Sequence, residues 1–241
     1  MGTNGPVGLV CNADHPVFAS VAARVARRDR EVVFFEPGVP IPHNAIDELA
    51  LLVNKKVRLA SFRALHYADR TGVPTWNGFV PTTALSCRLV ALYALDAVGC
   101  RTPPVTFEKP TGEYVAKTRY GWEGEPSVGG DGDFYQELLR SEPVDYKYYA
   151  VDTGDGIETR VLVVRSKLFG EKELLDTTDP DPTLESRVAD LVGRFDARAL
   201  GVDFVRSDGD YYAVDVNVAP SFRDADLEDA LVASIESSLR E

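Results

Sequence analysis

The stretch that decides the fold lies near the C-terminus and reads Gly201-Val-Asp-Phe-Val-Arg-Ser-Asp-Gly-Asp-Tyr-Tyr-Ala-Val-Asp-Val-Asn-Val-Ala-Pro220. The polar turn at residues 207–210 predicts two short strands joined as a hairpin. Each strand carries a polar residue where apolar alternation predicts a hydrophobic one, namely Asp203 in the first and Asp215 and Asn217 in the second. Side chains alternate between the faces of a strand, so Asp215 and Asn217 must share a face, and pairing through the turn can place Asp203 beside them.

These three side chains predict a cation site. A segment otherwise suited to burial would hold them at high cost unless a cation neutralised their charge. Their oxygens are hard ligands that suit Mg²⁺ or Mn²⁺, ions that also keep positions open for water and substrate phosphate. We therefore expect Asp203, Asp215 and Asn217 to be metal ligands. The alternative is a hairpin with solvated acids at its edge, and the apolar residues around Asp215 argue against it.

The same pattern resembles the metal-binding end of the ATP-grasp superfamily: an acid in a Gly-Val-Asp strand, eleven residues, then acid-x-Asn followed by a proline. The ribosomal-protein glutamate ligases, the RimK-like branch, look closest, and the inositol-phosphate kinases come second. The resemblance implies an α/β fold in which an N-terminal parallel-sheet lobe precedes two β-rich lobes that sandwich ATP. It also implies ATP and Mg²⁺ (or Mn²⁺) as cofactors. Asp215 departs from the pattern, because relatives more usually have Glu there.

Composition limits the class of protein. A chain of 241 residues with 44% hydrophobic residues and alternating strand and helix patterns is expected to be globular. Its longest apolar runs have the length of a strand, and none approaches the roughly 18 residues of a membrane span. The N-terminus at residues 1–6 lacks the basic and apolar regions of a signal peptide, so we expect a cytoplasmic protein without a membrane partner. The three cysteines are expected to be reduced.

The charge distribution excludes further classes. The net charge is −12, with 19 Arg and only 7 Lys, and no basic stripe indicates nucleic-acid binding. An acidic, Lys-poor surface is what a salt-rich cytoplasm favours, because salt screens the self-repulsion of such charge. We therefore hypothesise a halophile-like source. The three histidines are scattered, which argues against zinc, and the sequence allows a homodimer.

The first 80 residues predict an α/β unit. Strands are expected at 7–11, 31–36 and 49–53, with helices at 16–28 and 61–71. This alternation favours a parallel sheet with crossover helices. The predicted division of the whole chain is a first lobe (1–80), a linker helix with a small nucleotide-binding lobe (81–138), and a C-terminal lobe with the metal site (139–241).

A phosphate site is expected between the first lobe and the hairpin. Lys117 ends an apolar strand and is followed by a glycine-containing loop, whose backbone N–H groups can approach phosphate oxygens. By resemblance, Lys117 is the phosphate-binding lysine of the family. A single helix is predicted from Thr83 to Val98, and it carries Arg88 where the family usually has Lys. Arg88 either binds phosphate or is a solvated helix charge.

The resemblance assigns further nucleotide contacts. The segment 134–139 looks like the family's hinge strand, which implies that the backbone of Glu137 and Leu138 receives the adenine edge. Asp145 stands near the position of an acid that binds ribose hydroxyls. Lys147 points the same way as Asp145 and makes this strand more like the inositol-phosphate kinases. Alternatively, Asp145 and Lys147 form a charge pair on an exposed face.

A basic pair follows the next predicted strand, at 157–164. Arg165 and Lys167 stand where relatives present basic groups to the transferred phosphate. Two cations there could neutralise charge that develops in phosphoryl transfer. Together with Lys117 they are the predicted catalytic residues. The alternative is an ordinary basic turn. Two further helices are expected, from Thr183 to Leu200 and from Asp224 to Arg240.

The leading functional hypothesis is an ATP- and Mg-dependent carboxylate-amine ligase that acts through an acyl-phosphate on a small molecule or peptide. The alternatives are a small-molecule kinase on the same fold, similar to inositol-phosphate kinases, and a nucleotide-binding module without turnover. The acceptor is expected to contact a scattered set of residues that forms no motif: Asn12 to His15, Asn77, Arg119, Tyr120, Trp122 and Arg223.

Overall fold

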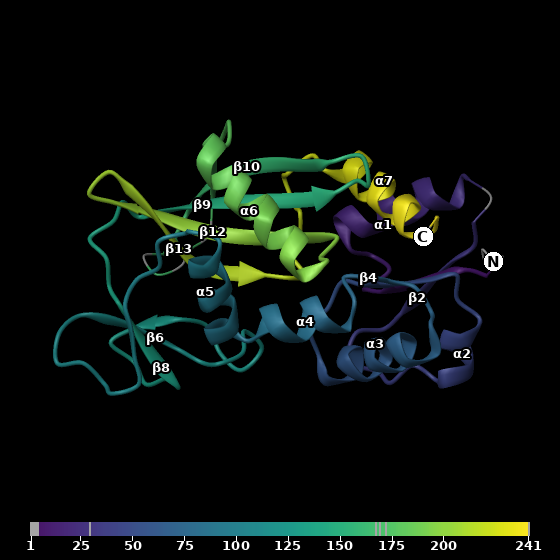
Figure 1. Ribbon diagram of the computed structural model, residues 1–241, viewed down its shortest axis with the longest axis horizontal. Coiled ribbons are helices and arrows are strands. Elements are labelled where there is room, and N and C mark those ends of the chain that lie inside the picture. Colours follow the sequence, from purple (N-terminus) through teal and green to yellow (C-terminus); the bar gives the residue numbers. More distant parts are fainter. Residues whose placement is uncertain (1–4, 29, 167, 169, 172, 241) are drawn as a thin grey trace.

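The computed structural model describes residues 5–28, 30–166, 168, 170–171 and 173–240, which form three β-sheets with seven helices around them. Figure 1 shows the largest sheet lying along one side, with the small sheet beneath one end and the first lobe beneath the other. The mixed α/β architecture that the sequence predicts is confirmed.

The first lobe holds a four-stranded parallel sheet in the order β2-β1-β3-β4. Its two central strands are buried along their whole length, as expected for a parallel sheet with elements on both faces. The strands are β1 (Val7–Val10), β2 (Val32–Phe35), β3 (Leu51–Asn54) and β4 (Thr75–Trp76), and the helices of the lobe are α1 (Pro16–Ala26), α2 (His43–Asp47) and α3 (Leu59–Thr71).

The second sheet is antiparallel, with five strands in the order β11-β10-β9-β12-β13. Its members are β9 (Val144–Asp152), β10 (Ile157–Arg165), β11 (Leu174–Thr178), β12 (Ala199–Ser207) and β13 (Asp210–Asn217). The predicted hairpin is β12 and β13, joined through Asp208 and Gly209 at φ angles of 52° and 86°. Such a two-residue turn matches the twist of the strands that it connects. Helix α6 (Pro182–Phe195) covers one face of this sheet (Figure 1).

The third sheet is small and antiparallel, in the order β5-β8-β6-β7. It consists of β5 (Val105–Thr106), β6 (Tyr114–Lys117), β7 (Ser127–Val128) and β8 (Phe134–Glu137). Residues 118–133 between β6 and β8, which we call the glycine loop, contain the two-residue strand β7 and no helix.

The first lobe and the large sheet share one hydrophobic core. Phe18 and Trp76 from the first lobe pack in the same cluster as Tyr149 and Phe222. Helix α7 (Glu228–Ser238) returns to α1, where Arg24 pairs with Asp229 at 2.5 Å. The last helix therefore packs against the first lobe, so both ends of the chain lie at the same end of the molecule (Figure 1).

Asn77 joins the first lobe to the large sheet. Its Nδ2 donates to the carbonyls of Ala199 (2.7 Å) and Val218 (2.8 Å), and its Oδ1 accepts from the N–H groups of Arg198 (2.8 Å) and Ala199 (3.0 Å). The side chain is buried, and all its hydrogen-bonding capacity holds backbone in place. Asn77 therefore has a structural position, and it does not line the cavity where we expected it to meet an acceptor.

Two predicted helices differ in the structure. Residues 79–97 form two helices, α4 (Phe79–Ser86) and α5 (Arg88–Ala97), because the backbone at Cys87 is extended and pairs with Tyr120 of the glycine loop. Helix α6 ends at Phe195, five residues early, because Asp196 adopts a left-handed conformation and Ala199 already begins β12. No helix in the described part of the chain is both long and apolar enough to cross a membrane.

Candidate functional site

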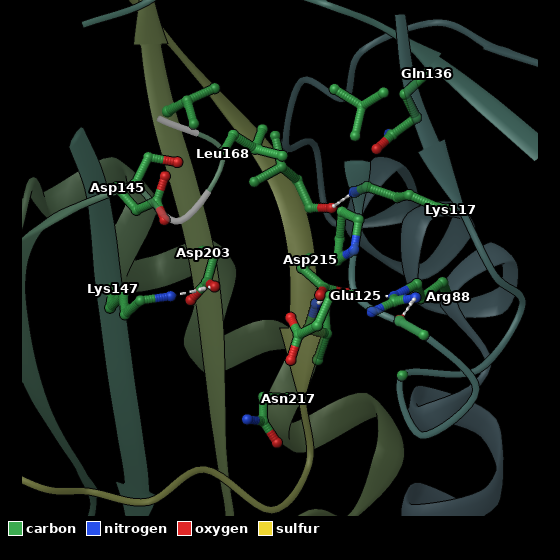
Figure 2. A pocket seen from close by; sticks show the side chains of 18 of the residues that line it. Arg88, Lys117, Glu125, Gln136, Asp145, Lys147, Leu168, Asp203, Asp215 and Asn217 are labelled. Atoms are coloured by element: carbon green, nitrogen blue, oxygen red, sulfur yellow. Dashed lines mark hydrogen bonds and ion pairs between the residues drawn. The ribbon is translucent and has the colours of Figure 1, made fainter. Parts of the chain in front are cut away.

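An open cavity of about 1030 Å³ lies between the large sheet, the small sheet and the end of the first lobe. Its walls are the cavity-facing side of β9, β12 and β13, the small sheet with the glycine loop, and the segment that follows β3. Figure 2 shows acidic and basic side chains converging on this space from both sides. Nine of the predicted site residues line it: Arg88, Lys117, Glu137, Leu138, Asp145, Lys147, Asp203, Asp215 and Asn217.

Three charged side chains form a row across neighbouring strands. Lys147 on β9 pairs in register with Asp203 on β12, which pairs in register with Asp215 on β13. The Nζ of Lys147 donates to Oδ2 of Asp203 in a close ion pair. Burial lowers the pKa of Lys147, but the attraction of Asp203 outweighs this effect and leaves the pKa above its ordinary value. Lys147 is therefore charged, and it fixes the orientation of Asp203.

A β-bulge turns Asp215 into the cavity. Asp203 pairs with Asp215, whereas the next residue, Phe204, pairs with Ala213, so Val214 is the extra residue. Strict alternation would put Asp215 on the core face with Ala213. The inserted residue reverses the alternation and brings the two carboxylates onto one face. The bulge thus explains why an acidic residue can stand two positions after the buried Ala213 and still face the cavity.

The bulge also places a carbonyl for Lys117. The Nζ of Lys117 donates to the carbonyl of Val214 at 2.6 Å, and the lysine is buried. Burial lowers the pKa of Lys117, while Asp215 opposes this shift. Burial likewise raises the pKa of Asp215, against the effect of Lys117 and Arg88. Lys117, Arg88 and Asp215 thus lie close enough for their opposite charges to act on one another.

Arg88 holds the glycine loop. Its Nη1 donates to the carbonyl of Thr118 (3.2 Å), the Oγ1 of Thr118 (2.8 Å) and the carbonyl of Gly124 (3.2 Å). Only 8% of the side chain is exposed, so the alternative of a solvated helix charge is wrong. Its Nε lies 3.7 Å from Oδ2 of Asp215, beyond hydrogen-bond distance, and has no hydrogen-bond partner among the described residues. The loop is thus tied to the start of α5 beside the carboxylates.

The predicted hinge lies at the opposite end of the cavity. Glu137 ends β8 and Leu138 follows it, and both line the cavity. The N–H of Glu137 already donates to the carbonyl of Pro104 at 3.1 Å, so it is not a free donor for a base edge. Gln136 is buried at the cavity wall, and within the described chain its Nε2 has no hydrogen-bond partner. Such an unsatisfied amide is costly unless a polar ligand meets it.

The donor set fits a hard divalent cation. Asp203 and Asp215 supply carboxylate oxygens from one face, and Asn217, two residues along, supplies an amide oxygen. The Oδ1 of Asn217 accepts from the N–H of Ala219 at 2.9 Å, and the Oδ1 of Asp215 accepts from the N–H of Val216 at 3.1 Å. These bonds orient the side chains and leave lone pairs for a metal. Over the residues described, no group of three or more His, Cys, Asp or Glu side chains could hold a metal ion, so this donor set depends on two carboxylates and one amide.

Some predicted residues lie elsewhere. Arg165 does not line the cavity, because its guanidinium pairs with Glu173 at 2.9 Å on the β10–β11 side. Lys167 lies outside the described residues, so its predicted role stays a prediction. Of the residues expected to meet an acceptor, only Trp122 reaches the cavity wall. His15 accepts a hydrogen bond from the N–H of Phe18 at 3.3 Å and caps helix α1.

One part of the wall was not predicted from the sequence. Lys55, Lys56 and Arg58 come directly after β3 and line the cavity. The sequence contains a pattern that could have predicted these residues, because Lys55 and Lys56 directly follow a strand of the predicted parallel sheet. Ligands of such sheets bind outside the carboxyl ends of the strands. Trp122 closes the same side, stacked on Tyr120 (4.4 Å between ring centroids) and edge-on to Phe62 of α3 (5.5 Å).

No family model matches this sequence, and no curated protein matches it significantly. Solved structures, in contrast, are similar over nearly the whole chain. A RimK-domain ATP-grasp protein from Sphaerobacter thermophilus has a TM-score of 0.70 at 14% identity, covering 98% of this chain and 99% of its own. The macrocyclase MdnC from Microcystis aeruginosa, bound to the precursor peptide MdnA, has 0.69 at 10%, covering 98% and 99%. The D-alanine–D-alanine ligase from Bacillus anthracis has 0.67 at 12%, covering 98% of each chain. The chain therefore has the ATP-grasp fold.

Proposed function

We propose that the protein is an ATP- and Mg²⁺-dependent carboxylate-amine ligase that joins a carboxylate to an amine. One observation carries the proposal: a single cavity holds the cation ligands Asp203, Asp215 and Asn217, the buried Lys117 and the hinge at Leu138. These are the parts that a nucleoside triphosphate with a divalent cation requires. In such a reaction ATP supplies the phosphoryl group that activates the carboxylate, and Mg²⁺ offsets the charge of the phosphates.

The side chains of the chain then have separate tasks. Lys117 and the glycine loop hold the phosphates, and Arg88 holds the loop in place. Lys147 fixes Asp203 by its ion pair, so that a cation meets an oriented carboxylate. Trp122 packs against Phe62 of the first lobe and forms part of the cavity wall. Positioning and charge neutralisation carry such a step without a protein nucleophile.

Structural neighbours support a ligase that acts on peptides or small molecules. The ligase PsnB, complexed with a minimal precursor, Mg and ADP, has a TM-score of 0.68 at 15% identity, covering 98% of this chain and 97% of its own. MdnC was likewise solved with a precursor peptide. The kinase alternative was favoured by Asp215-Val-Asn217 and by Lys147, the residue that makes its strand more like the inositol-phosphate kinases. Lys147 pairs with Asp203, which gives this lysine a task in a ligase as well, and the pattern Asp215-Val-Asn217 is compatible with both reactions.

Asp215→Ala tests the proposal. We expect the variant to lose Mg-dependent ADP binding and ATP turnover by about 100-fold or more, since a carboxylate that orients the metal is removed. Calorimetry with Mg²⁺ and ADP, and phosphate release from ATP, are the measurements. Asp210→Ala is the matched control, because Asp210 lies on the same strand but is exposed and pairs with Arg101. Equal behaviour of the two variants would refute the metal site and the proposed function with it.

The products separate the ligase from the kinase. A ligase releases ADP and free phosphate only when acid and amine are both present. A kinase moves the label of γ-labelled ATP onto the acceptor. Label found on the acceptor after complete turnover would contradict the ligase proposal while leaving the ATP site intact.

A further inference from the structure

Two lysines on the first-lobe wall of the cavity have no acidic partner. Lys55 and Lys56 directly follow β3, and both line the cavity. Among the described residues, no carboxylate forms an ion pair with either of them. On the facing wall, by comparison, Lys147, Arg88 and Lys117 each lie beside an acid. In a chain of net charge −12, two neighbouring cations without acidic partners are an exception.

Lys55 is fixed beside the proposed metal ligands through one residue, Ala219. The Nζ of Lys55 donates to the carbonyl of Ala219 at 2.7 Å, and the N–H of Ala219 donates to Oδ1 of Asn217 at 2.9 Å. The backbone N–H of Lys55 also donates to the carbonyl of Val10 at 3.3 Å, which ties the lysine to the parallel sheet. A single residue therefore separates the ammonium group from a proposed metal ligand.

The charge of Lys55 is poorly compensated. The residue is 2% exposed, and among the described residues its ammonium group meets the carbonyl of Ala219 and the ring of Phe18, whose centroid is 5.7 Å away. A buried charge is costly without an opposite charge nearby. Burial lowers the pKa of Lys55 to about 8, so the side chain is still charged at pH 7. An anion in the cavity would supply the missing charge.

The hairpin gives the order of sites along the cavity. The hinge end is fixed by a bridge between Ser141 and Ser207, the far end of β12. From Ser207 to Asp203 the strand covers roughly 13 Å, enough for the nucleoside part of ATP. Asn217 and then the contact of Lys55 come farther along, on the side away from the hinge.

This order decides which side chains meet the phosphoryl group. In phosphoryl transfer the attacking and leaving oxygens lie roughly in line with the phosphorus. Because ADP would occupy the hinge side, the attacking carboxylate must approach from the opposite side, where Lys55 and Lys56 lie. Arg165, the cation that the sequence predicts for this task, pairs with Glu173 instead and does not line the cavity.

We propose that Lys55 and Lys56 bind the phosphoryl group as it moves from ADP to the substrate carboxylate, so that the first lobe completes the catalytic site. The inference rests on the proposed function and adds two catalytic residues to it. A carboxylate oxygen forms a bond to the γ-phosphorus, and the bond from this phosphorus to the bridging oxygen of ADP breaks, so ADP leaves with the electron pair. The two ammonium groups offset the negative charge that the acyl-phosphate then carries.

The second step releases the same phosphate. The amine nitrogen forms a bond to the acyl carbon, and the bond from that carbon to the phosphate oxygen breaks. Phosphate leaves with the electron pair and takes up the proton that the nitrogen loses. Cations that hold the phosphate also make it a better leaving group, so Lys55 and Lys56 act in both steps.

The test measures the affinity of the full chain for Mg-ADP with and without aluminium fluoride, a mimic of the phosphoryl group during transfer. Lys56→Gln removes a charge from a half-buried position, and Lys56→Arg keeps the charge. Lys55→Met removes the buried charge and keeps most of the apolar side chain. Arg70→Gln is the matched control, because Arg70 is exposed on α3 and does not line the cavity. Calorimetry gives each dissociation constant.

We expect aluminium fluoride to tighten the binding of Mg-ADP to the wild type. Lys56→Gln and Lys55→Met should each lose roughly tenfold or more of this tightening, because a charge-assisted hydrogen bond is removed, while the affinity for Mg-ADP alone stays within about twofold. Lys56→Arg should restore most of the tightening, and Arg70→Gln should bind like the wild type. A purely structural role of Lys56 would not produce this selective loss.

Several results would overturn the inference. Weaker binding of Mg-ADP alone in Lys56→Gln would assign the lysine to the phosphates of the nucleotide. Equal loss in Lys56→Gln and Arg70→Gln would reduce the effect to general surface charge. Full tightening in Lys56→Gln, or no tightening in a wild type that binds Mg-ADP, would show that the lysines do not meet the phosphoryl group. A wild type that fails to bind Mg-ADP would instead refute the proposed function.

Discussion

The two walls of the cavity differ in whether their charged side chains have partners of opposite sign. On the hairpin wall, each acid lies beside a cation: Asp203 pairs with Lys147, and Asp215 lies between Lys117 and Arg88. On the first-lobe wall, Lys55, Lys56 and Arg58 have no acidic partner among the described residues. The charges of the hairpin wall are thus compensated within the chain, whereas the cations of the first-lobe wall have no acidic partner among the described residues.

The two walls keep their positions through contacts between the first lobe and the large sheet, and Asn77 makes four of the hydrogen bonds there. Asn77→Ala removes four buried hydrogen bonds and leaves backbone groups of β12 and Val218 unsatisfied. We expect the free energy of unfolding to fall by about 3 kcal/mol or more, since each such bond contributes about 1 kcal/mol and orphaned groups add a penalty. Urea unfolding measures this effect. Asn44→Ala on exposed α2 is the control and should leave the free energy of unfolding nearly unchanged. A similarly small effect for Asn77→Ala would show that other contacts hold the first lobe on the large sheet.

The next largest effect concerns the loop that spans the two walls. Arg88→Lys keeps the charge but loses the planar group that reaches Thr118 and Gly124 together. We expect Mg-ADP affinity to fall roughly tenfold, through loss of loop order. Calorimetry checks this, with Arg101→Lys at an exposed ion pair as the control. Unchanged affinity in Arg88→Lys would mean that the charge alone matters, as in the lysine of the family pattern.

The smallest effect is a pH dependence specific to the first-lobe wall. Burial lowers the pKa of Lys55 from 10.5 to about 8, Cys11 acts against this shift, and Lys56 adds to it. Between about pH 8 and 10.5 the unfolded chain holds a proton on Lys55 that the folded chain lacks, so the free energy of unfolding should rise with pH across this window. Urea unfolding between pH 7 and 10.5 measures the step. In Lys55→Met the step should vanish, and its persistence there would assign it to another group.

Much of the hairpin wall could be predicted from the sequence. Asp203, Asp215 and Asn217 stand out because a period of two links neighbours along a strand, and a polar side chain breaks an apolar alternation visibly. Lys117 at a strand end before glycines is equally local. The ATP-grasp fold followed from the order of these motifs, and the structure confirms it. The position of Arg88 was also expected, although its hold on the glycine loop was not.

The sequence by itself therefore determined the fold, the hairpin and the polar residues of one wall. Tertiary structure decided three other features: the bulge at Val214 that turns Asp215 into the cavity, the pairing of Lys147 with Asp203, and the approach of Lys55 to Ala219. Arg165 was predicted to face the transferred phosphate, but it pairs with Glu173 outside the cavity. The physical reason is the distance along the sequence between the residues that produce each feature. Strand alternation and turns arise from neighbours in the chain, whereas ion pairs and buried cations depend on residues far apart in sequence that only packing brings together.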